Sequence, residues 1–371
     1  MRIMVLGADG YIGWPLWHFL ASRGHEVCAI DSLVKRHWRV KLKIGAFGRS
    51  AEEKTPYVLM VGERGQLWDA LNHFQPEAII HLAEQPSAPL SMGSLELARV
   101  TQLQNIDSTL TLMWDVRRFS ELKGWMSHII KLGSMGEYGT PNIPIEEGWL
   151  EVEHKGHRDR VLYPKKPGSF YHASKVADSV NLEFGCRAWG LRVTDLNQGV
   201  VWGTGTEECP FEDPARATFW HYDELFGTVV NRFVAQAAVG STLSVYGGGR
   251  QQRGFIHLQD SLRCIEIAAL NPAREGEFRV FNQLSETLSI REIADKFVSV
   301  SRYVENPRVE DEEHLYRVAH SALPKLGFDN PRKLTCEEAD AMVSQLQQSP
   351  ELDNHRSAIT ATRDPEVKWR P

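Results

Sequence analysis

The chain has 371 residues, of which 42% are hydrophobic and 24% charged, a balance typical of a soluble globular enzyme with one large or two fused domains. Its net charge of −6 argues against nucleic acid or an anionic membrane as the main partner. The sequence contains no apolar stretch of membrane-spanning length, and its five scattered cysteines show no metal spacing and no CxxC pair. We therefore expect a cytoplasmic enzyme with reduced thiols, no bound metal and no signal peptide before its first strand.

The chain begins with a strand, a glycine-rich turn and a helix, the order that binds dinucleotides. Residues Arg2–Leu6 form a short apolar run, which predicts a buried parallel strand. The turn that follows has the spacing GxxGxxG. Gly7 permits a tight turn, Gly10 lets the backbone approach a pyrophosphate, and Gly13 allows close packing of the helix. We expect this turn to bind NAD, with further contacts from Asp9, Tyr11 and Ile12.

The second predicted strand, Glu26–Ile30, is followed by an acidic residue, Asp31. A carboxylate at this distance from the glycines hydrogen-bonds the adenosine ribose and disfavours the 2′-phosphate of NADP. Lys35 and Arg36 follow closely and leave NADP open, but the acid occupies the tip of the strand and favours NAD. The candidate residues of the ribose pocket are Asp31, Ser32, Leu33 and Arg36.

Strands and helices alternate up to residue 200 and predict an α/β fold, a Rossmann-type doubly wound parallel sheet with its site at the carboxyl ends of the strands. After a basic, irregular insert at residues 37–56, we expect strands at 57–61, 78–82 and 127–132 and a helix at 95–118. The segments after these strands supply further candidate cofactor contacts. These are Glu63 and Arg64 near the adenine, and Leu82, Glu84 and the inward-facing Asn105.

Tyr171 and Lys175, four residues apart, open the next predicted helix. Positions i and i+4 share a helix face, so the phenol and the ammonium can point into one site. The cation favours the phenolate and should lower the pKa of Tyr171 from its usual value of about 10, as a general base requires. Alone, the pair is weak evidence, and a solvated lysine above a half-buried tyrosine is the more ordinary interpretation. Ser134, at the end of a predicted strand, adds a hydroxyl, and the three groups beside a nicotinamide would form a hydride-transfer site.

The domain organisation includes one insertion in the first half of the chain. Residues 149–163 alternate around Lys155-Gly156 and predict a β-hairpin, either a lid or a surface hairpin, within an insert at about 149–168. We expect three parts: an NAD-binding domain at 1–200, a smaller C-terminal α/β domain at 201–345 that binds the nucleotide sugar and is interleaved with the first, and a loosely packed peripheral tail at 346–371.

The second domain carries polar residues suited to a nucleotide sugar. A helix is expected at 226–240 and a glycine-rich pair of strands at 244–257. Arg253 and Arg308 could clamp a diphosphate, although each alone could equally form a surface ion pair. The candidate substrate contacts are Gln85, Ser134, Asn197, Gln198, Thr228, Asn231, Arg232, Tyr246, Arg253 and Arg308.

The glycine turn, Asp31, Ser134 and the Tyr171–Lys175 pair together resemble those of extended short-chain dehydrogenases/reductases that act on nucleotide sugars. Longer stretches narrow the resemblance to the UDP-sulfoquinovose synthase family, from residue 1 to about 330, with a weaker echo near Trp369. These stretches are Asp31–Arg36, Ala83–Pro89, Lys131–Asn142, Ala188–Gly190, Thr194–Val200 and Asn306–Glu310.

The resemblance implies an enzyme that joins UDP-glucose and sulfite using bound NAD, without net redox change. Tyr171 would take the proton of the C4 hydroxyl as hydride passes from C4 to NAD⁺. Lys175 would hold the phenolate and the nicotinamide ribose, and Ser134 would bond O4. The 4-ketone acidifies C5–H, so water leaves from C6, sulfite adds to the 5,6-enone, and the hydride returns to C4.

The residues after Ser134 depart from those of related enzymes. The 4,6-dehydratases of the superfamily have two acids where this chain has Met135 and Gly136, so the chain lacks their acid–base pair. The elimination then needs another base, for which we expect His172, with Glu137 as the second choice. A helix histidine bonded to backbone is the alternative for His172.

A second departure from the family pattern leaves the identity of the nucleophile open. Plant-like members have Arg and Tyr in place of Pro86 and Leu90, and an arginine there could bind the sulfonate. A related enzyme that stops at the 5,6-ene, or adds another nucleophile, would use the same residues. A UDP-glucose 4-epimerase would leave Met135-Gly136-Glu137 unexplained, and a non-enzymatic NAD-binding regulator should have lost the tyrosine or the lysine. The resemblance also implies a homodimer through helices at 95–118 and 171–189, with a sulfite-delivering partner left open.

Overall fold

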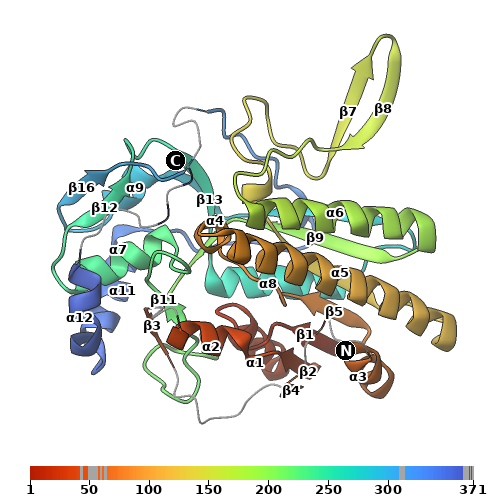
Figure 1. The fold of residues 1–371 in the computed structure, drawn as a ribbon, viewed down its shortest axis with the longest axis horizontal. Helices are drawn as coiled ribbons and strands as arrows, with labels where there is room; N and C mark the ends of the chain where they lie inside the picture. Colours follow the sequence, from red (N-terminus) through yellow and green to blue (C-terminus); the bar gives the residue numbers. More distant parts are fainter. Residues whose placement is uncertain are drawn as a thin grey trace.

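The computed structural model describes residues 1–41, 45–48, 57–58, 61, 65–308, 314–361, 367 and 369. A seven-stranded parallel sheet with helices on both faces forms the larger part of the molecule, and a group of short strands and helices lies beside it (Figure 1). The strand order is β14-β9-β6-β5-β1-β2-β4. The predicted fold class, an α/β doubly wound parallel sheet with a smaller α/β domain, is therefore confirmed. None of the helices formed by the described residues is long and apolar enough to cross a bilayer.

The sheet reverses its direction of growth between β1 and β5. The chain first adds strands on one side of β1 and then returns to the other side, which leaves a crevice at the carboxyl ends of these two strands. The sheet strands are β1 (Arg2–Leu6), β2 (Glu26–Asp31), β4 (Tyr57–Val58), β5 (Ala78–His81), β6 (His128–Ser134), β9 (Arg192–Gln198) and β14 (Phe278–Gln283).

The strands are apolar throughout because both faces of the sheet are covered. Along β1, Met4 and Leu6 pack in the core beneath the helices of one face, whereas Ile3 and Val5 pack beneath those of the other. The first face carries α3 (Gln66–Phe74), α5 (Leu95–Lys123) and α6 (Phe170–Trp189), and the second carries α1 (Gly13–Ser22), α8 (Leu258–Leu270) and α10 (Ala322–Lys325). The shorter α2 (Val34–Lys41), α4 (Ala88–Met92) and η1 (Met135–Glu137) follow β2, β5 and β6.

The smaller domain surrounds a second apolar core that includes Trp220 and Phe233. Its sheets are β10 (Val200–Trp202), β13 (Gln252–His257) and β15 (Glu286–Ser289); β12 (Leu243–Tyr246) with β16 (Ser301–Val304); and β11 (Trp220–His221) with β3 (Ala46–Phe47). Its helices are α7 (Val229–Ala238), α9 (Ile290–Ala294), α11 (Cys336–Gln347) and α12 (Leu352–Thr360). Between these elements the chain returns to the larger domain, because α8 packs on the seven-stranded sheet and β14 is one of its strands.

Two local expectations were wrong. Residues 244–257 form two strands as predicted, but β12 pairs with β16 and β13 pairs with β10 and β15, so the two strands do not pair with each other. The glycines between them turn the chain away, with φ of 62° at Gly247 and 71° at Gly249. Residues 37–56, expected to be irregular, begin within α2 and include β3 among their described positions.

The expectation of a loosely packed tail after residue 345 was also wrong for residues 346–361. Leu352 and Ile359 are both 5% exposed and belong to the second core. His355 hydrogen-bonds the Tyr222 hydroxyl at 2.8 Å. The two apolar side chains are seven residues apart, which places them on one face of α12.

The predicted hairpin is confirmed as β7 (Trp149–His154) and β8 (His157–Leu162), which project from the body of the molecule (Figure 1). Lys155 and Gly156 both have positive φ, 51° and 77°, as a two-residue turn that matches the twist of the strands requires.

Candidate active site

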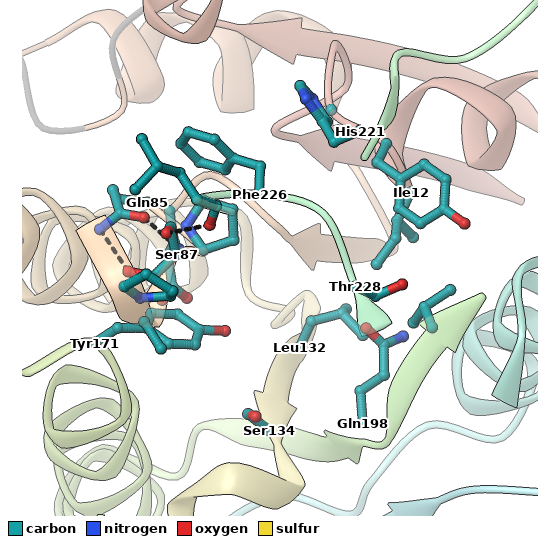
Figure 2. A pocket seen from close by; sticks show the side chains of 18 of the residues that line it. Ile12, Gln85, Ser87, Leu132, Ser134, Tyr171, Gln198, His221, Phe226 and Thr228 are labelled. Atoms are coloured by element: carbon teal, nitrogen blue, oxygen red, sulfur yellow. Dashed lines mark hydrogen bonds between the residues drawn. The ribbon is translucent and has the colours of Figure 1, made fainter. Parts of the chain in front are cut away.

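A cavity of about 820 Å³ lies over the crevice between β1 and β5, and residues of the smaller domain form its other wall. Figure 2 shows side chains from several elements directed into it, including Tyr171 from α6, Ser134 from β6 and Gln198 from β9. No group of three His, Cys, Asp or Glu side chains among the described residues could hold a metal ion. The chemistry must therefore be read from the residues that line this cavity.

The glycine turn brings three backbone segments unusually close together. Gly7 has a φ of 88°, and a Cβ on it would collide with the carbonyl of Leu82. A Cβ on Gly13 would overlap the carbonyl oxygen of Gly7, so the first turn of α1 lies directly against the end of β1. This arrangement places the amino end of α1 at the cavity, where its backbone N–H groups suit a pyrophosphate.

Asp31 lies at the edge of the same half of the cavity, at the end of β2. Its carboxylate accepts hydrogen bonds from the backbone N–H groups of Asp9 at 2.9 Å and Leu33 at 2.7 Å. Burial raises the pKa of Asp31, and these two bonds oppose that rise. Arg36 donates to Asp9 through two guanidinium nitrogens, Nε at 2.8 Å and Nη2 at 2.6 Å, and does not itself line the cavity. These residues fit the ribose of NAD better than a 2′-phosphate.

Tyr171 and Lys175 face the cavity from the first turns of α6. The helix begins where Ser169 Oγ accepts the backbone N–H of His172 at 3.2 Å, and this cap fixes Tyr171 at the cavity wall. Lys175 Nζ donates to the Leu132 carbonyl at 2.6 Å and forms an ion pair with Glu84 Oε2 at 2.7 Å. In Figure 2 the phenol of Tyr171 and the hydroxyl of Ser134 approach the same space from different elements.

The pKa of Tyr171 is raised, not lowered, so that sequence-based expectation was wrong for the protein alone. Burial of the phenol is the largest effect and raises the pKa, Lys175 lowers it, and Glu84 raises it again. The expectation considered only the nearest cation on the same helix. It missed both the depth of the phenol in the cavity and the carboxylate that follows β5.

Glu137 is fully buried behind the cavity wall and does not line the cavity. Its Oε1 accepts the Ser134 backbone N–H at 2.9 Å and lies 3.3 Å from Lys131 Nζ, and its Oε2 lies 2.5 Å from Lys165 Nζ. Burial alone would raise the pKa of Glu137, but the two lysines lower it to about 2. This buried carboxylate holds the loop after β6 in place and is badly placed to reach a bound sugar.

His172 lines the cavity beside Tyr171, with ring centroids 4.9 Å apart. Its Nδ1 lies 3.0 Å from Ser169 Oγ, and a Cβ built on Gly136 would overlap its Nε2. The imidazole therefore fills the space into which a side chain at position 136 would project. Burial, and then Arg308, lower the pKa of His172 to about 3, so the ring is neutral at physiological pH.

The opposite half of the cavity is lined by candidate substrate residues. Oxygen atoms of Thr228 and Asn231 are buried there with no hydrogen-bond partner among the described residues. Arg232 donates to the Tyr246 hydroxyl at 2.5 Å, and the guanidinium of Arg308 lies 5.4 Å from the centre of the Trp369 ring. Gln85, Ser134, Gln198 and Arg253 also line the cavity. Buried polar atoms without partners suit a polar ligand that would satisfy them.

Three further candidates among the described residues lie outside the cavity lining, as Arg36 and Glu137 do. Asn105 is fully buried and accepts the Gln85 backbone N–H at 2.8 Å, so it supports the segment after β5. Asn197 is also fully buried and donates to the Tyr138 hydroxyl at 2.7 Å. Leu33 does not line the cavity, and Glu63 and Arg64 lie outside the described residues.

Sequence reasoning missed several residues that line the cavity. His221 and Phe226 come from β11 and the segment before α7, and both are visible in Figure 2. Trp369 lies near the chain end, where only a short echo of a known family was noted. No motif or periodicity marks these positions, because they reach the cavity through the folding of the smaller domain.

Comparison with known proteins identifies close relatives. The model of the NAD dependent epimerase/dehydratase family matches residues 3–282. The chain is 40% identical to UDP-sulfoquinovose synthase of Sulfolobus acidocaldarius, over 100% of this chain and 98% of that one. It is 39% identical to the chloroplastic UDP-sulfoquinovose synthase of Spinacia oleracea, over 100% of this chain and 79% of that one. In fold it resembles UDP-glucose 4-epimerase of Thermotoga maritima, with a TM-score of 0.69 at 20% identity over 94% of this chain and 99% of that one.

The buried carboxylate of Glu137 generates a stability prediction. We expect Glu137→Gln to lower the free energy of unfolding at neutral pH by about 3 kcal/mol, because two buried lysines lose a counter-charge. The pKa of Glu137 is about 2 in the folded protein, below its unfolded value of about 4.3. Its stabilisation is therefore present above about pH 4.3 and is lost as the pH falls toward about 2.

Denaturant unfolding at several pH values measures this difference. The difference in free energy of unfolding between the parent protein and Glu137→Gln should be constant near neutral pH and should become smaller as the pH falls. Glu153→Gln, on the exposed hairpin, is the control and should change stability by less than about 1 kcal/mol. A gap that persists undiminished at acid pH would contradict the role of Glu137 as a buried counter-ion.

Proposed function

Because the chain belongs to the NAD dependent epimerase/dehydratase family, we propose that it converts UDP-glucose and sulfite into UDP-sulfoquinovose and water, using bound NAD. The observation that carries this proposal is one cavity lined by the Tyr171 phenol, the Ser134 hydroxyl and the His172 imidazole, in a chain similar over its full length to two UDP-sulfoquinovose synthases. The first two groups serve oxidation at C4, and the third serves the elimination across C5 and C6.

The cofactor half of the cavity fits NAD. The close approach of Gly7 to Leu82 leaves room for a pyrophosphate over the amino end of α1, and Asp31 is available to the adenosine ribose. When bound, NAD⁺ supplies the acceptor, and later the donor, of the hydride at C4. The chain's own residues then have to move protons and exclude water.

Tyr171 and Ser134 handle the C4 hydroxyl. Tyr171 takes the hydroxyl proton as C4 becomes a ketone, and it returns that proton when the alcohol is restored. Ser134 hydrogen-bonds the same oxygen. The position of Ser134 is fixed because its backbone N–H donates to Glu137. Lys175 lies in reach of the phenol, with its Nζ 6.0 Å from the ring centre.

His172 is the base that removes the C5 proton. It occupies the space where the related dehydratases carry an acid, and it is neutral, so it can accept a proton. The 4-ketone makes the C5 proton acidic, and that proton can leave with the C6 hydroxyl as water. Arg308 is the second cause of the low pKa of His172, so a bound diphosphate that neutralises this arginine makes the imidazole a stronger base.

Sulfite then forms a carbon–sulfur bond at C6 of the 5,6-enone, and the enolate regains a proton at C5. One observation favours a second candidate, a UDP-sugar 5,6-dehydratase or an enzyme that uses another nucleophile. Pro86 is exposed and lines the cavity where plant-like members have an arginine, so it offers no charge to an incoming anion. Arg253 and Arg308 are among the cationic side chains that line the same cavity, and they could attract sulfite in place of that arginine.

A homodimer through α5 and α6 completes the proposal. These helices pack side by side and expose large apolar side chains to solvent. The most exposed of them include Leu103 at 68% and Trp114 at 55% on α5, and Val180 at 51% and Phe184 at 52% on α6. Apolar side chains gathered on one pair of helices are typical of a protein interface. We also place the enzyme in the cytoplasm, since no disulfide joins any two of its five cysteines, all of which are described.

Mass spectrometry of the nucleotide sugar tests the reaction. After incubation with UDP-glucose, NAD⁺ and sulfite, we expect a sulfonated UDP-sugar that appears only when sulfite is present. Tyr171→Phe should abolish it, because the C4 proton then has no acceptor. A product lighter by one water would favour the 5,6-dehydratase, and a product of unchanged mass but new retention time would replace the proposal with a 4-epimerase.

The role of His172 generates a separate prediction. We expect His172→Gln to lower formation of the sulfonated sugar by about 10²–10⁴-fold, because general-base catalysis is lost. Reduction of NAD⁺ on addition of UDP-glucose should persist, since that step needs only the C4 groups. Exchange of deuterium from heavy water into C5, followed by NMR, should be lost. His154→Gln on the exposed hairpin is the matched control, and equal C5 exchange in both variants would exclude His172 as the base.

The dimer is tested by charge placed on the exposed helix face. Leu103→Glu should shift the protein from dimer to monomer in analytical ultracentrifugation, because a carboxylate would be buried at the interface. Val298→Glu is the control, since Val298 is 94% exposed and lies away from α5 and α6. A dimer that withstands the first substitution would place the interface elsewhere.

A further inference from the structure

Glu84 occupies an unusual place in the cavity, beside the lysine that the reaction depends on. It follows β5, lines the cavity, and its side chain is only 2% exposed. Its Oε2 lies 2.7 Å from Lys175 Nζ in an ion pair, and its Oε1 lies 3.8 Å from His81 Nε2. A carboxylate buried to this degree stays ionised only beside a cation. Lys175 is that cation.

The ion pair limits what Lys175 can do. A lysine ammonium has three protons to donate. One goes to the Leu132 carbonyl at 2.6 Å and a second faces Glu84 at 2.7 Å, which leaves one for the phenol of Tyr171 and the nicotinamide ribose. The positive charge that would favour a phenolate is also offset before any ligand binds, because a full negative charge lies on the other side of Nζ.

The other titratable groups around the pair do not replace this effect. Lys131 and Glu137, from β6 and η1, are paired with each other. His81 on β5 and His172 on α6 are neutral, since burial lowers the pKa of each to about 3. Burial raises the pKa of Asp178 on α6 well above its usual value, and the charge of Glu84 raises it further. Among the described residues, Glu84 is the carboxylate that forms an ion pair with Lys175, at 2.7 Å.

We propose that Glu84 is a positioning residue for the Tyr171–Lys175 pair: its carboxylate holds the ammonium in place and keeps the phenol protonated until a further positive charge enters the site. The inference rests on the proposed function, in which Tyr171 exchanges a proton with the C4 hydroxyl. The oxidised nicotinamide carries one positive charge and the reduced form carries none. With Lys175 already neutralised, Tyr171 is a base beside the oxidised form and an acid beside the reduced form, as a reaction without net redox change requires.

The test is a spectroscopic titration of Tyr171 that needs no turnover. The chain has 9 tyrosines, so the phenolate absorbance of Tyr171 is isolated by subtracting the titration of Tyr171→Phe from that of the parent protein, and likewise for each variant. We expect Glu84→Gln to lower the titration midpoint of Tyr171 by about 1–3 pH units, because the carboxylate charge is removed while the side-chain shape is kept. Glu84→Asp keeps the charge and should leave the midpoint close to that of the parent.

A midpoint that is unchanged in Glu84→Gln, or that moves equally in Glu84→Asp, overturns the proposal. Glu84→Ala, which also removes the charge, replaces the glutamine variant if that variant does not fold. The acid limb of the pH profile of kcat/KM should shift downward in Glu84→Gln by the same amount, whereas a purely structural residue would lower the rate at every pH without shifting the limb. Failure of the sulfonation assay leaves the titration unaffected, so the two proposals fail separately.

Discussion

The side of the cavity that carries Ser134 and Tyr171 depends on one fully buried ammonium group, that of Lys131. It reaches Glu137 and Asp195, each at 3.3 Å, and donates to Ser179 Oγ and the Lys175 carbonyl, each at 2.9 Å. A charge this deep is tolerated only where all its protons find partners, so the partners must hold their positions. They come from η1, β9 and α6, and the lysine itself from β6. The network thereby fixes the strand end that carries the serine against the helix that carries the tyrosine.

The sequence predicts the parts of this site whose signals are local. The glycine turn, the acid that ends the second strand and the turn of the hairpin each follow from a few adjacent residues and their backbone requirements. Lys131 offers no such signal, because a lysine in the run His128–Ser134 looks like an interruption of an apolar strand. Its partner Asp195 is 64 residues away in sequence. Leu352 and Ile359 were likewise missed, since their burial depends on a core built by distant strands.

The shift of the Tyr171 pKa, which the sequence predicted in the wrong direction, shows that local signals are also insufficient for electrostatics. Helix periodicity correctly brings Lys175 to the side of Tyr171, but the net effect on the phenol also includes burial and a carboxylate from another element. Charges act through space, and the two carboxylates that raise the pKa of Tyr171, Glu84 and Glu137, belong to the segments after β5 and β6. Periodicity can name the residues of such a site. Only the fold determines whether their charges add or cancel.

Two observations are connected: Gly136 stands where the related dehydratases have an acid, and the ring of His172 lies against it. A side chain at position 136 would overlap the ring of His172, so the two groups cannot occupy the site together. Gly136 thus leaves room for the imidazole from α6, which takes the acid–base role in the proposed mechanism. A neutral imidazole also differs from a carboxylate in what it tolerates nearby, since it does not repel an anion such as sulfite approaching C6. The exchange of acid for imidazole therefore suits an enzyme that must both eliminate water and admit an anionic nucleophile at the same carbon.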